Sequence, residues 1–274
     1  MPGFELINKK EKKAMNNLFD EGGILFAHGF ENLRKKFHIR EFEKNFSKRM
    51  DCKYSLAVTS GTAAIKIGLK ALGVKAGDEV ITQSFNFIAT IEAILDIGAK
   101  PIIINIKEDL NMDLNELKKK ITKKTKVILP VHMLGNSCEM NEIIKISKKY
   151  NLKILEDNCE AIGGKYRNRN LGTLGDVGVF SFDFGKTITT GEGGMIVTNK
   201  KKYYEYCNEY HDHGHQNLKK FSRGNDRAKI IGFNYRMTEM QGVIGEVQLK
   251  KLDKILIDNK KRFQALKKKI YKKF

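Results

Sequence analysis

The chain has 274 residues, of which 41% are hydrophobic, so it is long enough to form one large globular domain with an appendage. Its formal net charge is +19, but the lysines are scattered without interleaved aromatic side chains, which favours a solvated basic surface over a nucleic-acid site. The four cysteines lack the close spacing of zinc or redox sites, and no apolar run approaches the roughly 20 residues of a membrane span, so we expect reduced thiols, no bound metal, no membrane segment and a cytoplasmic location.

Residues 1–50 are polar and charged, which predicts a loosely attached N-terminal arm with a surface helix in the stretch from Glu31 to Arg49. From Ser55 onward, short apolar runs alternate with amphipathic stretches. This alternation predicts an α/β domain over residues 51–237, with a mostly parallel sheet flanked by helices on both faces. The expected strands are Leu56–Thr59, Glu79–Thr82, Pro101–Ile106, Val127–Val131, Lys153–Leu155, Val177–Phe182 and Met195–Thr198, and the expected helices are Ala63–Leu72 and Ile88–Ile97.

After Thr238 the pattern predicts one long helix. Met240, Val243 and Val247 recur at helical spacing, and leucines continue in a drifting phase behind them. We expect residues 238–274 to form a linking helix that leads into a small domain that this chain lacks.

A glycine-rich segment, residues 175–198, carries the lysine of greatest interest. It predicts a strand, a polar loop and a second strand, with Ser181 five residues before Lys186. A strand end and a turn could aim the serine hydroxyl at a phosphate while the lysine amine reaches an aldehyde carbon. Taken alone, Lys186 would be interpreted as a solvated lysine in a surface loop, because lysine is usually exposed.

Three further segments carry polar or aromatic groups at the ends of expected strands. Asp157 follows a strand where open α/β sheets bind ligands, and it could pair with a protonated ring nitrogen or simply cap a helix. Gly61 and Thr62 begin a helix whose amides form a ready anion site, although an ordinary helix cap explains them as well. Phe87 could lie flat on an aromatic ring or belong to the core.

Together these segments, in this order, resemble the DegT/StrS-type sugar aminotransferases, and the resemblance extends from the N-terminus to about Asp253. The resemblance implies the large domain of the aspartate aminotransferase fold (fold type I) and the cofactor pyridoxal 5'-phosphate (PLP). It also implies that Lys186 carries the cofactor as a Schiff base and moves protons, and that Asp157 pairs with the pyridine nitrogen. Phe87 would stack on the ring, while Ser181, Gly61 and Thr62 would form the phosphate cup.

The resemblance further implies a homodimer, because Asn234 matches a family position that reaches across to the neighbouring subunit's phosphate. Two departures from the family pattern stand out. Glu160 occupies a position where many members have a glutamine that bonds the cofactor's phenolic oxygen, and we interpret it as a residue that tunes the ring. Full-length relatives also continue for roughly a hundred further residues, so we expect a chain truncated at its C-terminal side.

Three stretches resemble one branch of the family, which makes 8-amino-3,8-dideoxy-manno-octulosonate from an 8-oxo octulosonic acid with glutamate as amino donor, for surface polysaccharides. They are residues 1–6, 131–135 and 211–215, and the last contains His213 and His215. We expect these histidines at the edge of the substrate or in a loop, rather than on a metal. The expected reaction is ping-pong transamination.

Alternative functions are a nucleotide-sugar aminotransferase that acts on a 4-keto-6-deoxyhexose and an inactive remnant that binds PLP or dimerises. A dehydratase of this fold would have histidine in place of Lys186.

Overall fold

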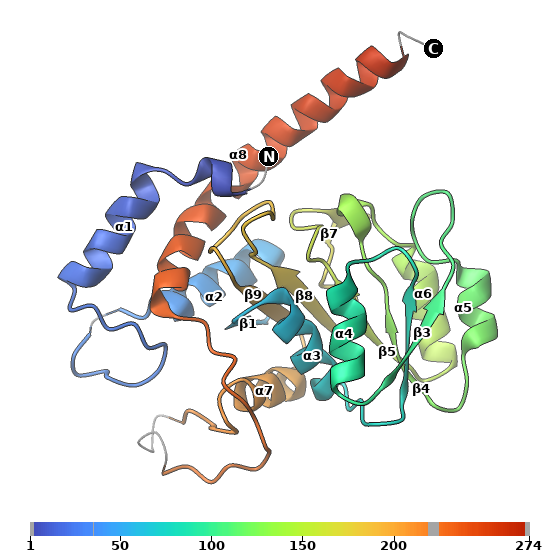
Figure 1. Ribbon diagram of the computed structural model, residues 1–274, viewed down its shortest axis with the longest axis horizontal. Coiled ribbons are helices and arrows are strands. Elements are labelled where there is room, and N and C mark those ends of the chain that lie inside the picture. The colour runs from blue at the N-terminus through green and yellow to red at the C-terminus, as the bar shows by residue number, and fades with distance from the viewer. Residues whose placement is uncertain (1–2, 35, 219–224, 272–274) are drawn as a thin grey trace.

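The computed structural model describes residues 3–34, 36–218 and 225–271, and its centre is a seven-stranded β-sheet (Figure 1). The strand order is β1-β9-β8-β5-β4-β2-β3. Strands β8, β5, β4, β2 and β3 run parallel to one another, whereas β9 is antiparallel to both β1 and β8. The strands of this sheet are Tyr54–Val58 (β1), Glu79–Gln83 (β2), Lys100–Ile104 (β3), Thr125–Leu129 (β4), Lys153–Asp157 (β5), Val177–Ser181 (β8) and Gly194–Thr198 (β9).

Helices cover both faces of the sheet. On one face, α3, α4 and α7 pack with the sheet in one hydrophobic cluster, while α2, α5, α6 and α8 contribute to clusters that include the residues of the opposite face. Val127 and Leu129 of β4 belong to the first face and Ile128 to the second, as the alternation of a strand requires. The helices are Lys9–Asp20 (α1), His38–Met50 (α2), Gly61–Ala71 (α3), Ile88–Asp96 (α4), Leu114–Lys120 (α5), Met140–Lys149 (α6), Lys201–Tyr210 (α7) and Glu239–Tyr271 (α8).

The mostly parallel sheet with helices on both faces is confirmed. All seven expected strands are present, with ends that shift by up to two residues, and the two expected helices correspond to α3 and α4. Short elements escaped the prediction: the 3₁₀ turns Gly3–Leu6 (η1) and Met133–Gly135 (η2), and the hairpin of Lys165–Tyr166 (β6) and Arg169–Asn170 (β7). None of the described helices combines the length and apolar character that spanning a membrane would require.

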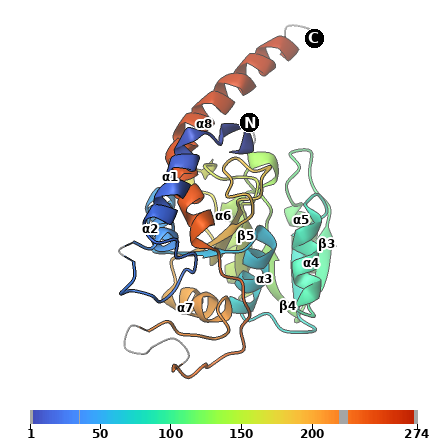
Figure 2. The same cartoon turned by 60° about the vertical axis from the view of Figure 1, so that its left-hand side comes forward.

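The prediction of a loosely attached arm at residues 1–50 is wrong. Helix α2 is part of the core, because Ile39, Phe42, Phe46 and Met50 recur at helical spacing and are all buried. Charged residues fill the rest of the helix and mask this apolar stripe in the sequence. Figures 1 and 2 show α1 and α2 beside the first half of α8, and both helices contact it.

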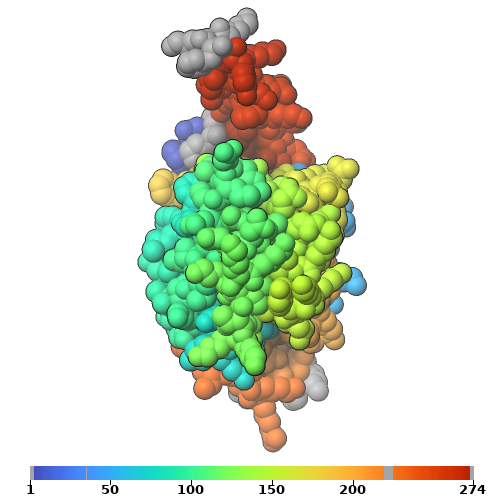
Figure 3. Space-filling view, turned by 90° about the vertical axis from the view of Figure 1, so that its right-hand side faces the viewer, coloured from blue at the N-terminus to red at the C-terminus, as the bar shows by residue number. Residues whose placement is uncertain are grey.

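Helix α8 has 33 residues and begins close to the predicted position. It buries its first half against α2, where Gly245 lets the two helices approach: a Cβ at this position would lie 2.7 Å from the ring of Phe42. Its last turns are exposed, and Figure 3 shows this red segment projecting beyond the body of the molecule. The division into domains at residues 50 and 237 stays a prediction.

Candidate active site

Four chain segments that leave the sheet at one edge carry most of the expected site residues. Strands β1, β2, β5 and β8 point in the same direction, because β9 reverses the chain between β1 and β8. Their C-terminal ends therefore meet at one edge, which is where open α/β sheets bind ligands. Gly61, Phe87, Asp157 and Ser181 lie at or just beyond these four ends.

Lys186 lies in the connection between β8 and β9, residues 182–193, which we call the lysine loop. The base of the loop is closed by hydrogen bonds from the Phe182 N–H to the Gly193 carbonyl (2.8 Å) and from the Thr190 N–H to the Phe182 carbonyl (3.0 Å). At its tip, the Lys186 Nζ lies 3.5 Å from Glu160 Oε1 and 5.9 Å from the centroid of the Phe87 ring. The amine is therefore held between a carboxylate and an aromatic ring, with 21% of its side chain exposed.

Asp157 ends β5 and is almost fully buried, at 4% exposure. Its Oδ2 accepts a hydrogen bond from Thr90 Oγ1 at 3.0 Å, and its Oδ1 accepts one from the Cys159 N–H at 3.0 Å. These two donors fix the plane of the carboxylate, and each oxygen keeps a lone pair for a further partner. Sequence reasoning missed Thr90, which lies in the first turn of α4, three residues after Phe87.

The start of α3 packs closely against Ser181. The Ser60 side chain caps the helix by accepting the Ala63 N–H at 3.1 Å, so the cap interpretation of this segment is right for Ser60. The amides of Gly61 and Thr62 lie in the first turn, where a helix offers its N–H groups no carbonyl partner. The Thr62 side chain is exposed. A Cβ at position 61 would lie 2.8 Å from the Ser181 Cβ, so only glycine lets the first turn of α3 lie this close to Ser181. Helix-start amides beside a serine hydroxyl suit a phosphate group.

Glu160 links the lysine loop to the segment after β4. Its Oε1 faces Lys186, and its Oε2 accepts the Leu134 N–H at 3.2 Å. Leu134 adopts a positive φ of 53°, which turns its amide toward the carboxylate and leaves its side chain 71% exposed. Sequence reasoning singled out residues 131–135 by resemblance alone, and no pattern identified the Leu134 amide as a partner of Glu160.

The two expected substrate histidines are held within the segment that follows α7. The backbone N–H of His213 donates to the Phe233 carbonyl (3.1 Å), and His215 Nδ1 lies 2.8 Å from Asp226 Oδ1. In Figures 1 and 2 this segment lies beyond α7, at the end of the molecule opposite the loop between β8 and β9. The structure of one chain therefore does not bring His213 and His215 to Lys186.

Asn234 has an exposed side chain and pairs through its backbone with Asp212. The next residue, Tyr235, accepts the Thr59 N–H at 3.0 Å, so Asn234 lies near the end of β1. Within the described ranges, no three His, Cys, Asp or Glu side chains gather into a group that could hold a metal ion.

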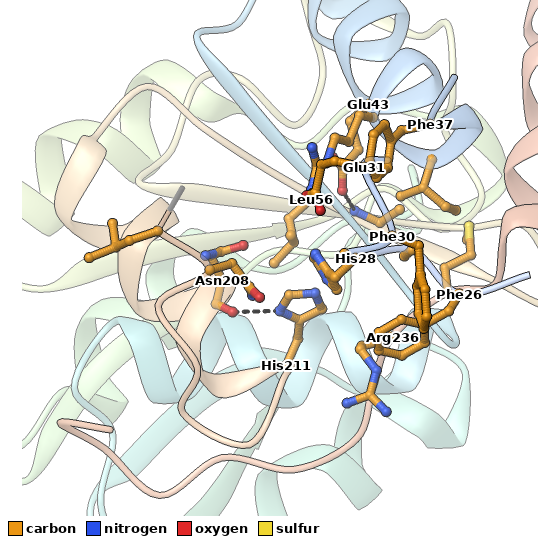
Figure 4. Close-up of a pocket in the computed structure, with 18 of the residues that line it drawn as sticks. Phe26, His28, Phe30, Glu31, Phe37, Glu43, Leu56, Asn208, His211 and Arg236 are labelled. Atoms are coloured by element: carbon orange, nitrogen blue, oxygen red, sulfur yellow. Dashed lines mark hydrogen bonds and ion pairs between the residues drawn. The ribbon is translucent and has the colours of Figure 1, made fainter. Parts of the chain in front are cut away.

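A cavity of about 960 Å³ lies beside the edge strand β1, and Lys186, Asp157 and Ser181 do not line it (Figure 4). Among the described residues that line it, none is an expected cofactor ligand. Glu43 lies in this cavity and accepts the Ala57 N–H at 2.7 Å, and burial raises its pKa to about 8 despite that bond. The lining includes Phe26, Phe30, Phe37, Glu43, His211 and Arg236.

The chain is similar in sequence and in structure to known enzymes. The GDP-perosamine synthase of Escherichia coli O157:H7 is 38% identical over 245 residues, which are 89% of this chain and 64% of that protein. The chain thus spans a little under two thirds of this relative's length. The solved structure of the aminotransferase from Psychrobacter cryohalolentis is similar with a TM-score of 0.81 at 33% identity, covering 89% of this chain and 62% of that one.

A further solved structure contains the cofactor. The E. coli GDP-4-keto-6-deoxy-D-mannose-3-dehydratase with bound hydrated PLP is similar with a TM-score of 0.80 at 32% identity, covering 90% of this chain and 66% of that one. PLP is the cofactor of this group of proteins, and the start of α3 packed beside the Ser181 hydroxyl, the buried Asp157 carboxylate and the Lys186 amine are groups that fit it. A family model matches residues 30–272, and the chain belongs to the DegT/DnrJ/EryC1/StrS aminotransferase family.

Proposed function

We propose that this chain is the PLP-binding part of a transaminase that transfers an amino group, with glutamate as donor, to the keto group of a nucleotide-linked sugar. The observation that carries the proposal is the position of Lys186, whose amine lies between the Glu160 carboxylate and the Phe87 ring at the sheet edge where Asp157 ends β5. The presence of lysine at this position favours amino transfer over dehydration, for which we expect histidine.

Bound PLP supplies an aldehyde that can take up nitrogen and a ring that delocalises negative charge. In this proposal, the Lys186 amine holds the aldehyde carbon and moves the proton during transfer. The Asp157 carboxylate, fixed by Thr90 and the Cys159 amide, keeps a proton on the ring nitrogen. Phe87 covers one face of the ring.

The remaining residues act at the two ends of the cofactor. Ser181 and the first amides of α3, those of Gly61 and Thr62, hold the phosphate. Glu160 orients the Lys186 amine through their 3.5 Å ion pair and is itself oriented by the Leu134 N–H. Because Glu160 and Lys186 have side chains that are only about a quarter exposed, this pair is well placed to hold the amine in one direction.

The substrate assignment differs from the first expectation. Comparison favours a nucleotide-sugar substrate over the 8-oxo octulosonic acid, because the relative described above is a GDP-perosamine synthase. The similar dehydratase structure acts on a GDP-4-keto-6-deoxymannose, a sugar of the same chemical class. We therefore propose a 4-keto-6-deoxyhexose linked to a nucleoside diphosphate as the amino acceptor.

We also propose that the active unit is a homodimer in which Asn234 of one chain reaches the phosphate site of the other. Its side chain is exposed and close to the end of β1, so it is free to contact a second chain. Mixing a Lys186→Ala chain with an Asn234→Ala chain should test this, because a mixed dimer would contain one intact site. More PLP labelling of Lys186 in the mixture than the two separate variants account for supports the proposal. Labelling equal to the average of the two separate variants contradicts it.

The first experiment asks whether Lys186 binds the cofactor. The purified chain is incubated with PLP, reduced with borohydride and digested, and the modified peptide is located by mass spectrometry. We expect the label on Lys186, with Lys200 as a built-in comparison, because the Lys200 amine pairs with Asp176 away from the site. A label spread over surface lysines, or its survival in Lys186→Ala, would contradict the function.

The second experiment separates the substrates. Glutamate and PLP are supplied with either GDP-4-keto-6-deoxymannose or 8-oxo-3,8-dideoxy-manno-octulosonate, and 2-oxoglutarate and the amino sugar are measured. We expect product from the nucleotide sugar. Product from the octulosonate alone would restore the first expectation, while labelled Lys186 without product from either would leave a PLP-binding remnant.

A further inference from the structure

The N-terminal turn η1 is bonded to the lysine loop at the reactive residue itself. The Gly3 N–H donates to the Lys186 carbonyl at 2.6 Å. In addition, the ring of Phe4 packs against that of Phe184, two residues before Lys186, with centroids 5.7 Å apart. The tip of the lysine loop is therefore held from outside the loop by residues that lie 180 or more positions earlier in the chain.

The contact at Gly3 is too close for any other residue. A Cβ at this position would lie 2.8 Å from the Thr189 nitrogen and 2.9 Å from two backbone atoms of Ile188. Backbone atoms cannot move aside as the end of a flexible side chain can, so an added methyl group must push η1 away from the loop. The glycine is thus explained by the close approach of two backbones.

The other end of this segment is fixed to α8. Lys251 Nζ donates to the Leu6 carbonyl at 2.6 Å and pairs with the buried Glu11, which also accepts from Gln248 at 2.8 Å. Asn8 caps α1 and exchanges hydrogen bonds with Glu11 in a capping box. Residues 6–11 therefore have a fixed position on α8, and η1 connects them to the lysine loop.

We propose that η1 is a clasp, in which the Gly3 N–H and the Phe4 ring position Lys186 relative to α8. The proposal rests on the proposed function in so far as Lys186 is the cofactor lysine. Gly3 and Phe4 are positioning residues, since their contacts are with the loop and they act on the cofactor only through Lys186. Releasing the clasp would leave the folded core in place and allow the loop tip to move.

The test uses Gly3→Ala and Phe4→Ala, with Phe19→Ala as matched control, because Phe19 is an exposed aromatic of the same N-terminal region on α1. Amide hydrogen exchange of residues 183–191 is measured on the cofactor-free protein. Loss of the Gly3 hydrogen bond is worth about 1 kcal/mol, and loss of the Phe4–Phe184 ring pair is worth a similar amount, so we expect exchange roughly fivefold faster in both variants and unchanged in the control. Exchange within α3 should stay at the parent's rate.

A second readout addresses the lysine itself. With PLP bound, Gly3→Ala and Phe4→Ala should release the cofactor several times faster than the parent and label more slowly at Lys186, and Phe4→Tyr should restore both rates. A chain that begins at Asn8 keeps the capping box and should behave as Gly3→Ala does. Parent-like exchange in all these variants would overturn the clasp. Failure of the parent to label at Lys186 would instead overturn the proposed function, and the exchange result would still stand.

Discussion

Replacing Gly61 with alanine should damage the phosphate site while leaving the fold intact. The new Cβ would lie 2.8 Å from the Ser181 Cβ, 3.2 Å from its hydroxyl oxygen and 3.1 Å from the Cys159 sulfur. All three distances are shorter than ordinary van der Waals contacts. Ser181 ends β8 and cannot retreat without moving the base of the lysine loop, so its hydroxyl must turn or the start of α3 must shift.

Two opposing effects set the change in stability. Overpacking of this kind typically destabilises by about 1–3 kcal/mol, whereas alanine is favoured over glycine in a helix by up to about 1 kcal/mol. The free energy of unfolding should therefore fall by about 0–3 kcal/mol. The affinity for PLP should also fall, because a hydrogen bond to a charged phosphate is worth about 1.5–3 kcal/mol. Its loss corresponds to a dissociation constant that is roughly 10- to 100-fold larger.

Gly68→Ala provides the control. It lies on the same helix, and its Cβ would meet the Leu155 side chain at 2.7 Å, so it overpacks the core without approaching Ser181. PLP titration followed by visible absorbance, with chemical unfolding in parallel, should show a loss of stability in both variants and a loss of affinity in Gly61→Ala alone. A Gly61→Ala protein that binds PLP within twofold of the parent would refute the assignment of the phosphate to the start of α3 beside Ser181.

Three other substitutions test the remaining groups. Asp157→Asn keeps the shape of the side chain but removes the negative charge proposed to pair with the ring nitrogen, so PLP affinity should fall at least about tenfold in a titration, the equivalent of about 1.4 kcal/mol. Glu160→Gln removes a partly exposed ion pair and keeps an acceptor for the backbone, so unfolding should change by less than about 1 kcal/mol. Glu43→Gln removes a carboxyl whose pKa burial raises to about 8, and denaturation at several pH values should show equal stability near pH 4.5. The parent loses stability as pH rises from 4.5 to 8, because its native state binds the extra proton, so the variant should be more stable above pH 8 by up to about 5 kcal/mol.

The sequence was sufficient for the sheet and for the residues at its C-terminal edge. Strands such as Val127–Leu129 are short apolar runs between turns, and a parallel sheet brings the ends of such strands together whatever their exact bounds. This is why the sequence alone predicts Asp157, Ser181 and Lys186 at one edge of the sheet. A resemblance supplied their roles, which the geometry by itself does not.

What the sequence could not show depends on contacts between distant segments. The apolar stripe of α2 is diluted by charged residues, and its burial against α8 depends on Gly245 in another part of the chain. The Leu134 amide reaches Glu160 only because Leu134 adopts a positive φ, which no local pattern in the residues 131–135 specifies. The bond from Gly3 to Lys186 likewise joins two loops whose positions are set by the helices between them.

Lys186 does not line the large cavity, and the apolar residues around it are exposed at the surface of a single chain. Phe87, Leu134 and Phe184 are 64%, 71% and 60% exposed, although each has an apolar side chain close to the lysine in space or in the chain. Apolar groups that gather at a functional edge usually meet another surface. In the proposed homodimer, a second chain would cover this edge and convert it from an open surface into an enclosed site. The proposed homodimer thus predicts that the site in a single chain is incomplete, and the mixed-dimer labelling of Lys186→Ala with Asn234→Ala measures directly whether a second chain completes it.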